Sequence, residues 1–176
     1  LEIHAKSIGL RAFSSENISI GTLTIGTEVE TFESVTSGYY TSFRQFMYCK
    51  IGKLIYLPAN ATTGSKCNSG IFQSATIGEL EFSDEIEVVP NYLFFNAIME
   101  LDDFTLNVPV IGYYSFSGSD IKFHKLTIGE EVTTFSINDS NYSRAFDYNT
   151  IDMLYYNAAE AQIETLASLV AGPFSY

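Results

Sequence analysis

Apolar and polar residues alternate over short stretches along most of this chain. The apolar runs are rich in Val, Ile, Phe, Tyr and Thr, and clusters of Gly, Ser, Asn and Asp separate them. This pattern predicts short, half-buried β-strands joined by turns, which is typical of a β-sandwich or barrel and not of a fold with alternating strands and helices. We predict strands within residues 8–13, 18–23, 42–51, 53–58, 70–77, 79–82, 85–89, 92–100, 108–116, 121–126 and 152–156.

One stretch of the chain occurs nearly twice. Residues 23–32 read LTIGTEVETF and residues 126–135 read LTIGEEVTTF. At an offset of 103, residues 8–43 align with residues 111–146 without a gap, and 16 of the 36 pairs are identical. Unrelated segments match at roughly one position in fifteen. Duplication of a structural unit explains this better than convergence of two hairpins, in which Gly26 and Gly129 would take positive φ in a tight turn.

The duplication leads to a specific fold prediction. We expect an all-β, antiparallel β-sandwich, Ig-like or jelly-roll-like, with a short C-terminal helix within residues 157–173. That segment is rich in Ala, Leu and Glu, and Gly172-Pro173 would end the helix. The second unit is followed by less chain than the first, so its sandwich would lack strands. The helix, the other half of the chain or a strand from a neighbouring molecule could complete it.

Residues 1–11 are the candidate for such an inserted strand. They precede the predicted sandwich head of residues 12–176, and apolar residues alternate with polar ones at the start of the segment. The alternative is an ordinary edge strand of the same molecule. If the segment is a donor strand, its anchoring side chains are Leu1, Ile3, Ala5, Ile8 and Leu10.

Composition bounds the partners and the compartment. The formal net charge is −12, with only nine Lys and Arg residues, so nucleic acid and anionic membrane surfaces are not expected as partners. Charged residues make up 17% of the chain, and Ser, Thr, Asn and Tyr supply most of the polarity, which favours an extracellular, cell-surface location. No apolar run is long enough to span a membrane. A chain that begins with Leu1 indicates removal of a signal peptide or choice of an internal starting point.

Cysteine and asparagine residues offer candidate covalent modifications. A disulfide between Cys49 and Cys67 would stabilise the intervening loop by about 3 kcal/mol, and two free buried thiols are the alternative. A metal site is not expected, because the two histidines lie far from the cysteines in sequence. Four N-x-[ST] sequences could carry N-linked glycans, at Asn17, Asn60, Asn138 and Asn141.

Motifs that carry catalytic chemistry do not occur. The chain has no Gly-rich phosphate loop and no HExxH, GxSxG or CxxC motif, so we expect neither enzymatic activity nor a cofactor. Acidic clusters at 83–87, 102–103 and 138–139 are interpreted as solvated loops and not as calcium ligands. Tyrosine pairs at 39–40, 113–114 and 155–156 could form a carbohydrate-binding platform, although the chain has no Trp.

The stretch AFSSENISIGTLTIG at residues 12–26 resembles the start of mature TasA- and camelysin-type proteins. Related secreted filament subunits, including archaeal bundling pili and threads, are similar in outline. The resemblance implies β-sandwich heads that N-terminal donor strands join into a homopolymer. A second resemblance, to tandem Ig-like repeats of bacterial cell-surface proteins, uses residues 102–103 as a linker. The residues that carry the first resemblance are Ala12, Phe13, Ser14, Gly21, Thr22 and Leu23.

These observations together give one preferred function and two alternatives. The preferred hypothesis is a structural subunit of an extracellular filament, assembled by insertion of the N-terminal strand into the next subunit. The first alternative is a monomeric secreted cell-surface or carbohydrate-binding β-sandwich module. A viral capsid or spike protein is the second alternative.

Overall fold

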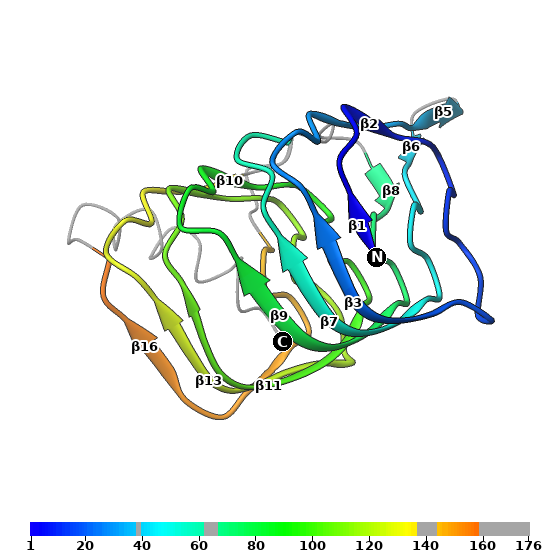
Figure 1. The fold of residues 1–176 in the computed structure, drawn as a ribbon. Coiled ribbons are helices and arrows are strands. Elements are labelled where there is room, and N and C mark those ends of the chain that lie inside the picture. Colours follow the sequence, from blue (N-terminus) through cyan, green and yellow to red (C-terminus); the bar gives the residue numbers. More distant parts are fainter. Residues whose placement is uncertain (38–39, 62–66, 137–143, 159–176) are drawn as a thin grey trace.

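The protein is a β-solenoid, in which the chain winds through successive coils that stack on one another (Figure 1). The computed structural model describes residues 1–37, 40–61, 67–136 and 144–158. Within these ranges every regular element is a β-strand. Each coil places its main strand parallel to the strand of the coil before it, so the solenoid has one long sheet along its side.

The long sheet contains one main strand from each coil. All of its pairings are parallel, and β13 pairs with two successive short strands of the last coil. The strands in spatial order are β1 (Glu2–Ile3), β3 (Ser19–Ile25), β7 (Lys50–Tyr56), β9 (Thr76–Phe82), β11 (Ile98–Leu106), β13 (Ile121–Ile128) and β15 (Thr150–Ile151), with β16 (Leu154–Tyr156) also beside β13.

Shorter strands form a second side of the coils. Parallel pairs follow the main strands: β2 (Ser7–Ile8) with β4 (Thr31–Phe32), and β10 (Val88–Val89) with β12 (Val110–Ile111) and β14 (Thr134–Phe135). A third small sheet contains β5 (Val35–Ser37), β6 (Tyr40–Ser42) and β8 (Cys67–Ser69). Its β5–β6 pair is antiparallel, unlike every other strand pair among the described residues.

Equivalent residues of successive coils stack on one another inside the solenoid. Leu23 pairs with Leu54, and Leu54 pairs with Leu80. One coil alone cannot bury its apolar face, but a stack of coils buries it continuously. The core therefore runs the length of the solenoid and does not lie between two sheets.

A ladder of phenylalanine rings forms the other wall of this core. Neighbouring rings are 5.0–5.5 Å apart between centroids, and the members are Phe13, Phe46, Phe72, Phe94, Phe116 and Phe146. Each ring lies in the turn that leads into a main strand, and successive members are 33, 26, 22, 22 and 30 residues apart in sequence. Four of the five neighbouring pairs are stacked and the Phe94–Phe116 pair is tilted, and aromatic pairs at this spacing stabilise a fold by more than the area that they bury.

Left-handed residues bracket the ladder. Two positions before the ladder phenylalanine, Arg11, Arg44, Tyr92, Tyr114 and Arg144 have φ between 48° and 59°. Two positions after it, the residues with positive φ are Tyr48, Ser74, Asn96, Gly118 and Tyr148. Non-glycine residues in this region are strained, typically by 1 kcal/mol or more, so the stacked coils must hold these corners in place.

The predicted antiparallel β-sandwich is wrong, because the strands are parallel and belong to one solenoid. The repeat at an offset of 103 is a relation between distant coils: β13 and β14 are the counterparts of β3 and β4, and the coils between them repeat the same unit with less sequence identity. The shorter stretch after the second copy therefore does not indicate strands missing from a sandwich.

The prediction for the two repeated glycines is also wrong. Gly118 is the only glycine with positive φ among the described residues, so neither Gly26 nor Gly129 is in a left-handed turn. Both are needed for close approach between coils. A Cβ on Gly26 would lie 2.8 Å from the carbonyl oxygen of Ile3, and one on Gly129 would overlap the side chain of Asn107.

The N-terminal segment forms the first coil of its own chain. β1 pairs with β3 at Glu2↔Thr24 and Ile3↔Ile25, and β2 pairs with β4. The predicted donor strand is therefore wrong for this structure, because its backbone pairs with its own molecule. The predicted helix at 157–173 falls almost entirely on residues 159–176, outside the described residues. Among those that are described, no helix is long and apolar enough to cross a membrane.

Candidate binding cleft

The pairing of the long sheet is interrupted between β9 and β11. These strands pair only at their first two positions, whereas β7 and β9 pair along their whole length. Pairing between the same two coils resumes at Val88↔Val110, in β10 and β12. The two coils therefore touch at both ends of this side and part between them.

The parting follows from the lengths of the two strands. β9 has seven residues and is followed by five residues before β10, whereas β11 has nine residues and is followed by three before β12. The totals are equal, so the coils match at both ends. Within the strands the buried positions are out of step, because β11 has an additional inward residue, Leu101. The apolar residues of β9 and β11 cannot all stack, and the sheet opens.

On the β9 side, backbone groups point into the opening. The N–H of Ser83 donates to the carbonyl oxygen of Tyr56 in β7, at 3.2 Å. Successive residues of a strand direct their N–H and C=O groups to opposite neighbours. Leu80 and Phe82 therefore direct theirs toward β11, where β9 forms no further ladder pair.

The β11 side of the opening has the same character. The carbonyl oxygen of Leu106 accepts a hydrogen bond from the N–H of Gly129 at 2.8 Å, so Leu106 faces the coil of β13. By the same alternation, Thr105 directs its N–H and C=O groups toward β9. The opening is thus bounded by two strand edges inside one sheet.

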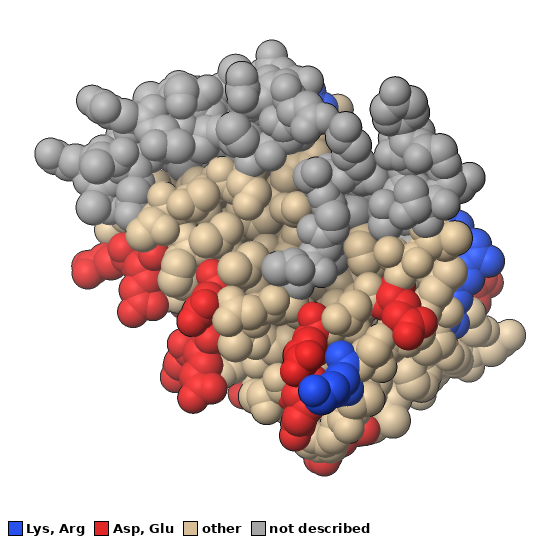
Figure 2. All heavy atoms as spheres, turned by 90° about the horizontal axis from the view of Figure 1, so that it is seen from above, with Lys and Arg blue, Asp and Glu red and all other residues tan. Residues whose placement is uncertain are grey.

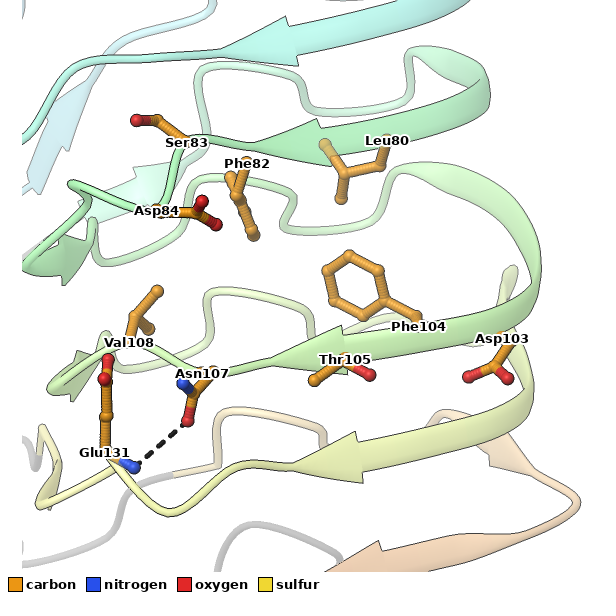
Figure 3. A pocket seen from close by; sticks show the side chains of 10 residues that line it. All are labelled: Leu80, Phe82, Ser83, Asp84, Asp103, Phe104, Thr105, Asn107, Val108 and Glu131. Atoms are coloured by element: carbon orange, nitrogen blue, oxygen red, sulfur yellow. Dashed lines mark hydrogen bonds between the residues drawn. The ribbon is translucent and has the colours of Figure 1, made fainter.

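A cleft of about 680 Å³ occupies the opening (Figure 3). This volume lies within the range of 300–1,000 Å³ that is common for ligand sites. Its lining comes from β9 and the loop after it, from β11 and the loop after it, and from the loop after β13. The lining residues are Leu80, Phe82, Ser83, Asp84, Asp103, Phe104, Thr105, Asn107, Val108 and Glu131.

The floor of the cleft is apolar. Leu80 and Phe82 are half-buried, and Phe104 is only 7% exposed. The Phe82 and Phe104 rings lie 5.9 Å apart between centroids, and Figure 3 shows the side chains of Leu80 and Phe104 facing each other across the gap. An apolar side chain of a ligand would be removed from water on this floor.

The rim of the cleft carries acidic side chains at both ends. A lysine pairs with the acidic residue at one end, whereas the acidic residues at the other end have no such partner among the described residues. Asp103 accepts a hydrogen bond from the Lys125 ammonium group at 2.7 Å. Asp84 and Glu131 lie at the other end, where the strands finish (Figure 3). The ion pairs of the described residues include neither of these two carboxylates. Viewed from above, most of the described surface is uncharged, and the charged side chains on it are more often acidic than basic (Figure 2).

A second polar cluster surrounds His124 on the outer face of β13. Its Nδ1 lies 2.7 Å from Asp152, and its Nε2 lies 3.0 Å from Glu100. These hydrogen bonds raise the pKa of His124, while His124 lowers the pKa values of Asp152 and Glu100. The cluster is solvent-exposed, and its hydrogen bonds join β11, β13 and the last coil.

His4 has a similar arrangement in the first coil. Its Nδ1 lies 3.2 Å from Glu28 and its Nε2 lies 3.5 Å from Glu2, and these contacts raise the pKa of His4. Among the described residues, no group of three or more His, Cys, Asp or Glu side chains could hold a metal ion. Neither histidine cluster is therefore a candidate metal centre.

The structure describes Cys49 but not the side chain of its predicted partner. Cys49 is a free, buried thiol that donates to the carbonyl oxygen of Phe13 at 2.7 Å, and burial raises the pKa of this thiol. The side chain of Cys67 lies outside the described residues. Because only one of the two thiols is described, the disulfide stays a prediction.

The other predicted sites are scattered. Asn17 and Asn60 are exposed, as a glycan would require, and Asn138 and Asn141 lie outside the described residues. The proposed strand anchors do not share one environment: Ile8 is buried, Ile3 and Leu10 are half-buried, and Leu1 and Ala5 are exposed. The rings of Tyr113 and Tyr114 pack against Tyr92 in one aromatic cluster and form no open platform.

The sequence did not predict the cleft, although two segments that contribute to its lining were identified as acidic clusters. The acidic clusters at 83–87 and 102–103 were interpreted as solvated loops, and one acidic residue of each, Asp84 and Asp103, lines the cleft. The available signal was the spacing of apolar residues, with TIGELEF in one coil and IMELDDFTL in the next. That difference has meaning only when the two segments are known to be neighbouring parallel strands.

Comparison of this chain with family models, with curated proteins and with solved structures found no match.

Proposed function

We propose that this protein is a non-catalytic binding module whose cleft between β9 and β11 takes up an extended peptide segment of another protein. The observation that carries this proposal is the interruption of the β9–β11 ladder, which leaves two strand edges facing a cleft with an apolar floor.

An extended peptide matches both features of the cleft. Its backbone offers N–H and C=O groups on both sides, as Leu80, Phe82 and Thr105 do on the walls. Its alternate side chains point to opposite faces, so one set would contact the floor of Leu80, Phe82 and Phe104. The other set would point to solvent. Main-chain hydrogen bonds would then provide affinity, and the floor and rim would provide selectivity.

The filament role expected from the sequence stays a prediction, because it depends on assembly. Its donor-strand mechanism is set aside, since β1 and β2 pair within their own chain. Carbohydrate binding also stays a prediction. The peptide proposal is preferred because the cleft walls are backbone edges, which complement another backbone.

The test is a binding screen with an immobilised array of synthetic peptides that alternate apolar and polar residues. A peptide that binds is then added to the protein, and amide hydrogen exchange is measured. Leu80, Phe82 and Thr105 should exchange fast in the free protein and be protected in the complex. Unchanged exchange at all three amides would show that the peptide binds elsewhere.

One substitution tests the backbone contact directly. Thr105→Pro removes a cleft-facing N–H group, whereas Thr105→Val keeps it and changes only the side chain. Binding should fall at least tenfold in the proline variant, which corresponds to about 1.4 kcal/mol, and little in the valine variant. Equal binding by both folded variants, or capture of glycans but no peptide on parallel arrays, would overturn the proposal.

A further inference from the structure

We infer that the cleft selects peptide segments that carry a Lys or Arg residue beside their apolar residues, and that Asp84 and Glu131 recognise that cation. This inference rests on the proposed peptide-binding function and adds the chemical class of the segment. It also fixes the end of the cleft at which the basic residue lies.

The charge distribution around the cleft is uneven. At one end, Lys125 neutralises Asp103 and also lies over the ring of Tyr155, 5.6 Å from its centroid. At the other end, Asp84 and Glu131 have no cationic partner among the described residues. A ligand ammonium or guanidinium group would therefore gain most at the end where the strands finish, since a carboxylate without a partner favours a nearby cation.

The Asp84 carboxylate comes from a loop with a defined shape. The N–H of Glu85 donates to Ser83 Oγ at 3.1 Å, which closes a local turn. Two residues beyond Asp84, Ile86 is 2% exposed and anchors the loop in the core. In Figure 3 the Asp84 side chain points toward the opening.

The Glu131 loop is held from the opposite side of the cleft. Its backbone N–H donates to Asn107 Oδ1 at 3.1 Å, and the next residue, Val132, is buried. Asn107 itself lines the cleft, so the hydrogen bond joins the β11 and β13 loops at the rim. The two carboxylates are thus carried by anchored loops on two sides of one opening.

A peptide cation fits this site better than a free divalent ion does. The described residues contain no group of three or more side chains able to hold a metal. Two carboxylates beside an apolar floor instead suit a side chain whose cationic head is attached to an apolar stem, as in Lys and Arg.

The chain provides a matched control for the experiment. Asp84→Asn with Glu131→Gln removes two negative charges at the cleft. Glu85→Gln with Glu130→Gln removes two from the adjacent positions of the same loops, which are exposed and do not line the cleft. The two double variants have equal net charge, so a difference between them reports local contact and not the overall field of an acidic protein.

The probes are a peptide from the array that contains Lys and the same peptide with Gln in its place. We expect Asp84→Asn with Glu131→Gln to weaken Lys-peptide binding about threefold to tenfold and to remove the preference for Lys over Gln. The control variant should keep the affinity and the preference. Fluorescence anisotropy measures both, and the salt dependence of binding should flatten only in the first variant.

The outcomes separate the two proposals. An equal loss in both double variants would overturn the local recognition by Asp84 and Glu131. Equal affinity of the wild-type protein for the Lys and Gln peptides would overturn the selectivity and leave the peptide-binding function standing. Absence of any peptide ligand in the array would overturn the proposed function itself.

Discussion

The coils on the two sides of the cleft have the same plan but different outer faces. Before the cleft, Gly21, Gly52 and Gly78 lie in one row across β3, β7 and β9. After it, the corresponding row contains Glu100 and Lys122, paired across β11 and β13 at 3.5 Å. In this row the first group of coils has close backbone approach, whereas the second has an ion pair between side chains. The cleft lies where the two groups meet.

This difference shows why a repeat protein can have a specific site. A stack of identical coils would pair along its whole length and offer only its surface. Here the strand length changes from seven residues in β9 to nine in β11, and the ladder opens at that step. A local break in regularity is thus the feature that creates a concave, chemically distinct place on the solenoid.

The largest expected effect comes from removing a ring at the junction. Phe94 is fully buried, and its ring lies 5.5 Å from Phe72 and 5.2 Å from Phe116 between centroids. Phe94→Ala should lower the free energy of unfolding by about 3–5 kcal/mol and uncouple the coils on either side of the cleft. Urea unfolding with hydrogen exchange measures both.

Phe95→Ala is the matched control, because this neighbour is half-buried and lies outside the ladder. Phe95→Ala should lower the free energy of unfolding clearly less than Phe94→Ala does. A loss below about 1 kcal/mol in Phe94→Ala would show that the ladder does not join the two groups of coils.

A smaller effect should come from the glycine row. A Cβ on Gly52 would lie 2.6 Å from the carbonyl oxygen of Gly21, whereas a Cβ on Gly21 would meet nothing within 4 Å. Gly52→Ala should destabilise the protein by about 1–3 kcal/mol through this overlap. Gly21→Ala should be neutral or stabilising by up to about 1 kcal/mol, because it restricts the unfolded chain. Thermal unfolding that ranked the two variants alike would contradict close coil approach in this row.

The next prediction concerns pH and compares the two histidine clusters. The pKa of His124 is raised in the folded state, chiefly by its hydrogen bond to Asp152 and next by that to Glu100. The stability that it contributes is therefore fully present below its unfolded pKa of about 6.5 and is lost as the pH rises through the raised pKa. His124→Gln should flatten this part of the stability profile.

Other charged groups also lie beside His124, and their charges contribute to the pH dependence that this experiment measures. Besides Glu100 on β11, which is already part of the cluster, they are Asp102 on β11 and Lys122 on β13. The first-coil counterpart, His4→Gln, should flatten the same pH range, since the pKa of His4 is also raised. Identical pH profiles for the wild-type protein and His124→Gln would rule out the proposed link between coils.

The smallest effect is expected at Tyr56. Its ring is fully buried between Phe32 and Phe82, and its hydroxyl has no hydrogen-bond partner among the described residues. Burial also raises the pKa of Tyr56. Tyr56→Phe should leave the free energy of unfolding unchanged or increase it by up to about 1 kcal/mol, because it removes an unsatisfied polar group. A clear loss of stability would show that the hydroxyl does have a partner.

Part of the fold could be predicted from the sequence. The prediction of an all-β chain is confirmed for the described residues, and the segments 18–23, 53–58 and 121–126 overlap the main strands β3, β7 and β13. The predicted segments 70–77 and 92–100 also include turns that carry ladder residues, such as Phe72 and Phe94. Apolar turn residues look like strand residues in a sequence, because burial imposes the same composition on both.

The candidate site could not be predicted from the sequence, because it depends on which strands lie side by side. Asp84 and Asp103 are visible as acidic residues, but their place on one rim depends on which strands are neighbours. The turns before the ladder phenylalanines could not be predicted either. Residues such as Tyr92 and Arg144 have positive φ there, a conformation that is usually expected of Gly or Asn.

The sequence by itself determined that this chain forms strands and that residues such as Leu23 and Leu54 lie inside, because alternation and β-branched composition are local properties. Only the tertiary structure decided that the strands are parallel coils, since a strand has the same period of two in a sandwich and in a solenoid. It also decided where the ladder opens, because a mismatch of strand lengths acts only between strands that the fold has made neighbours.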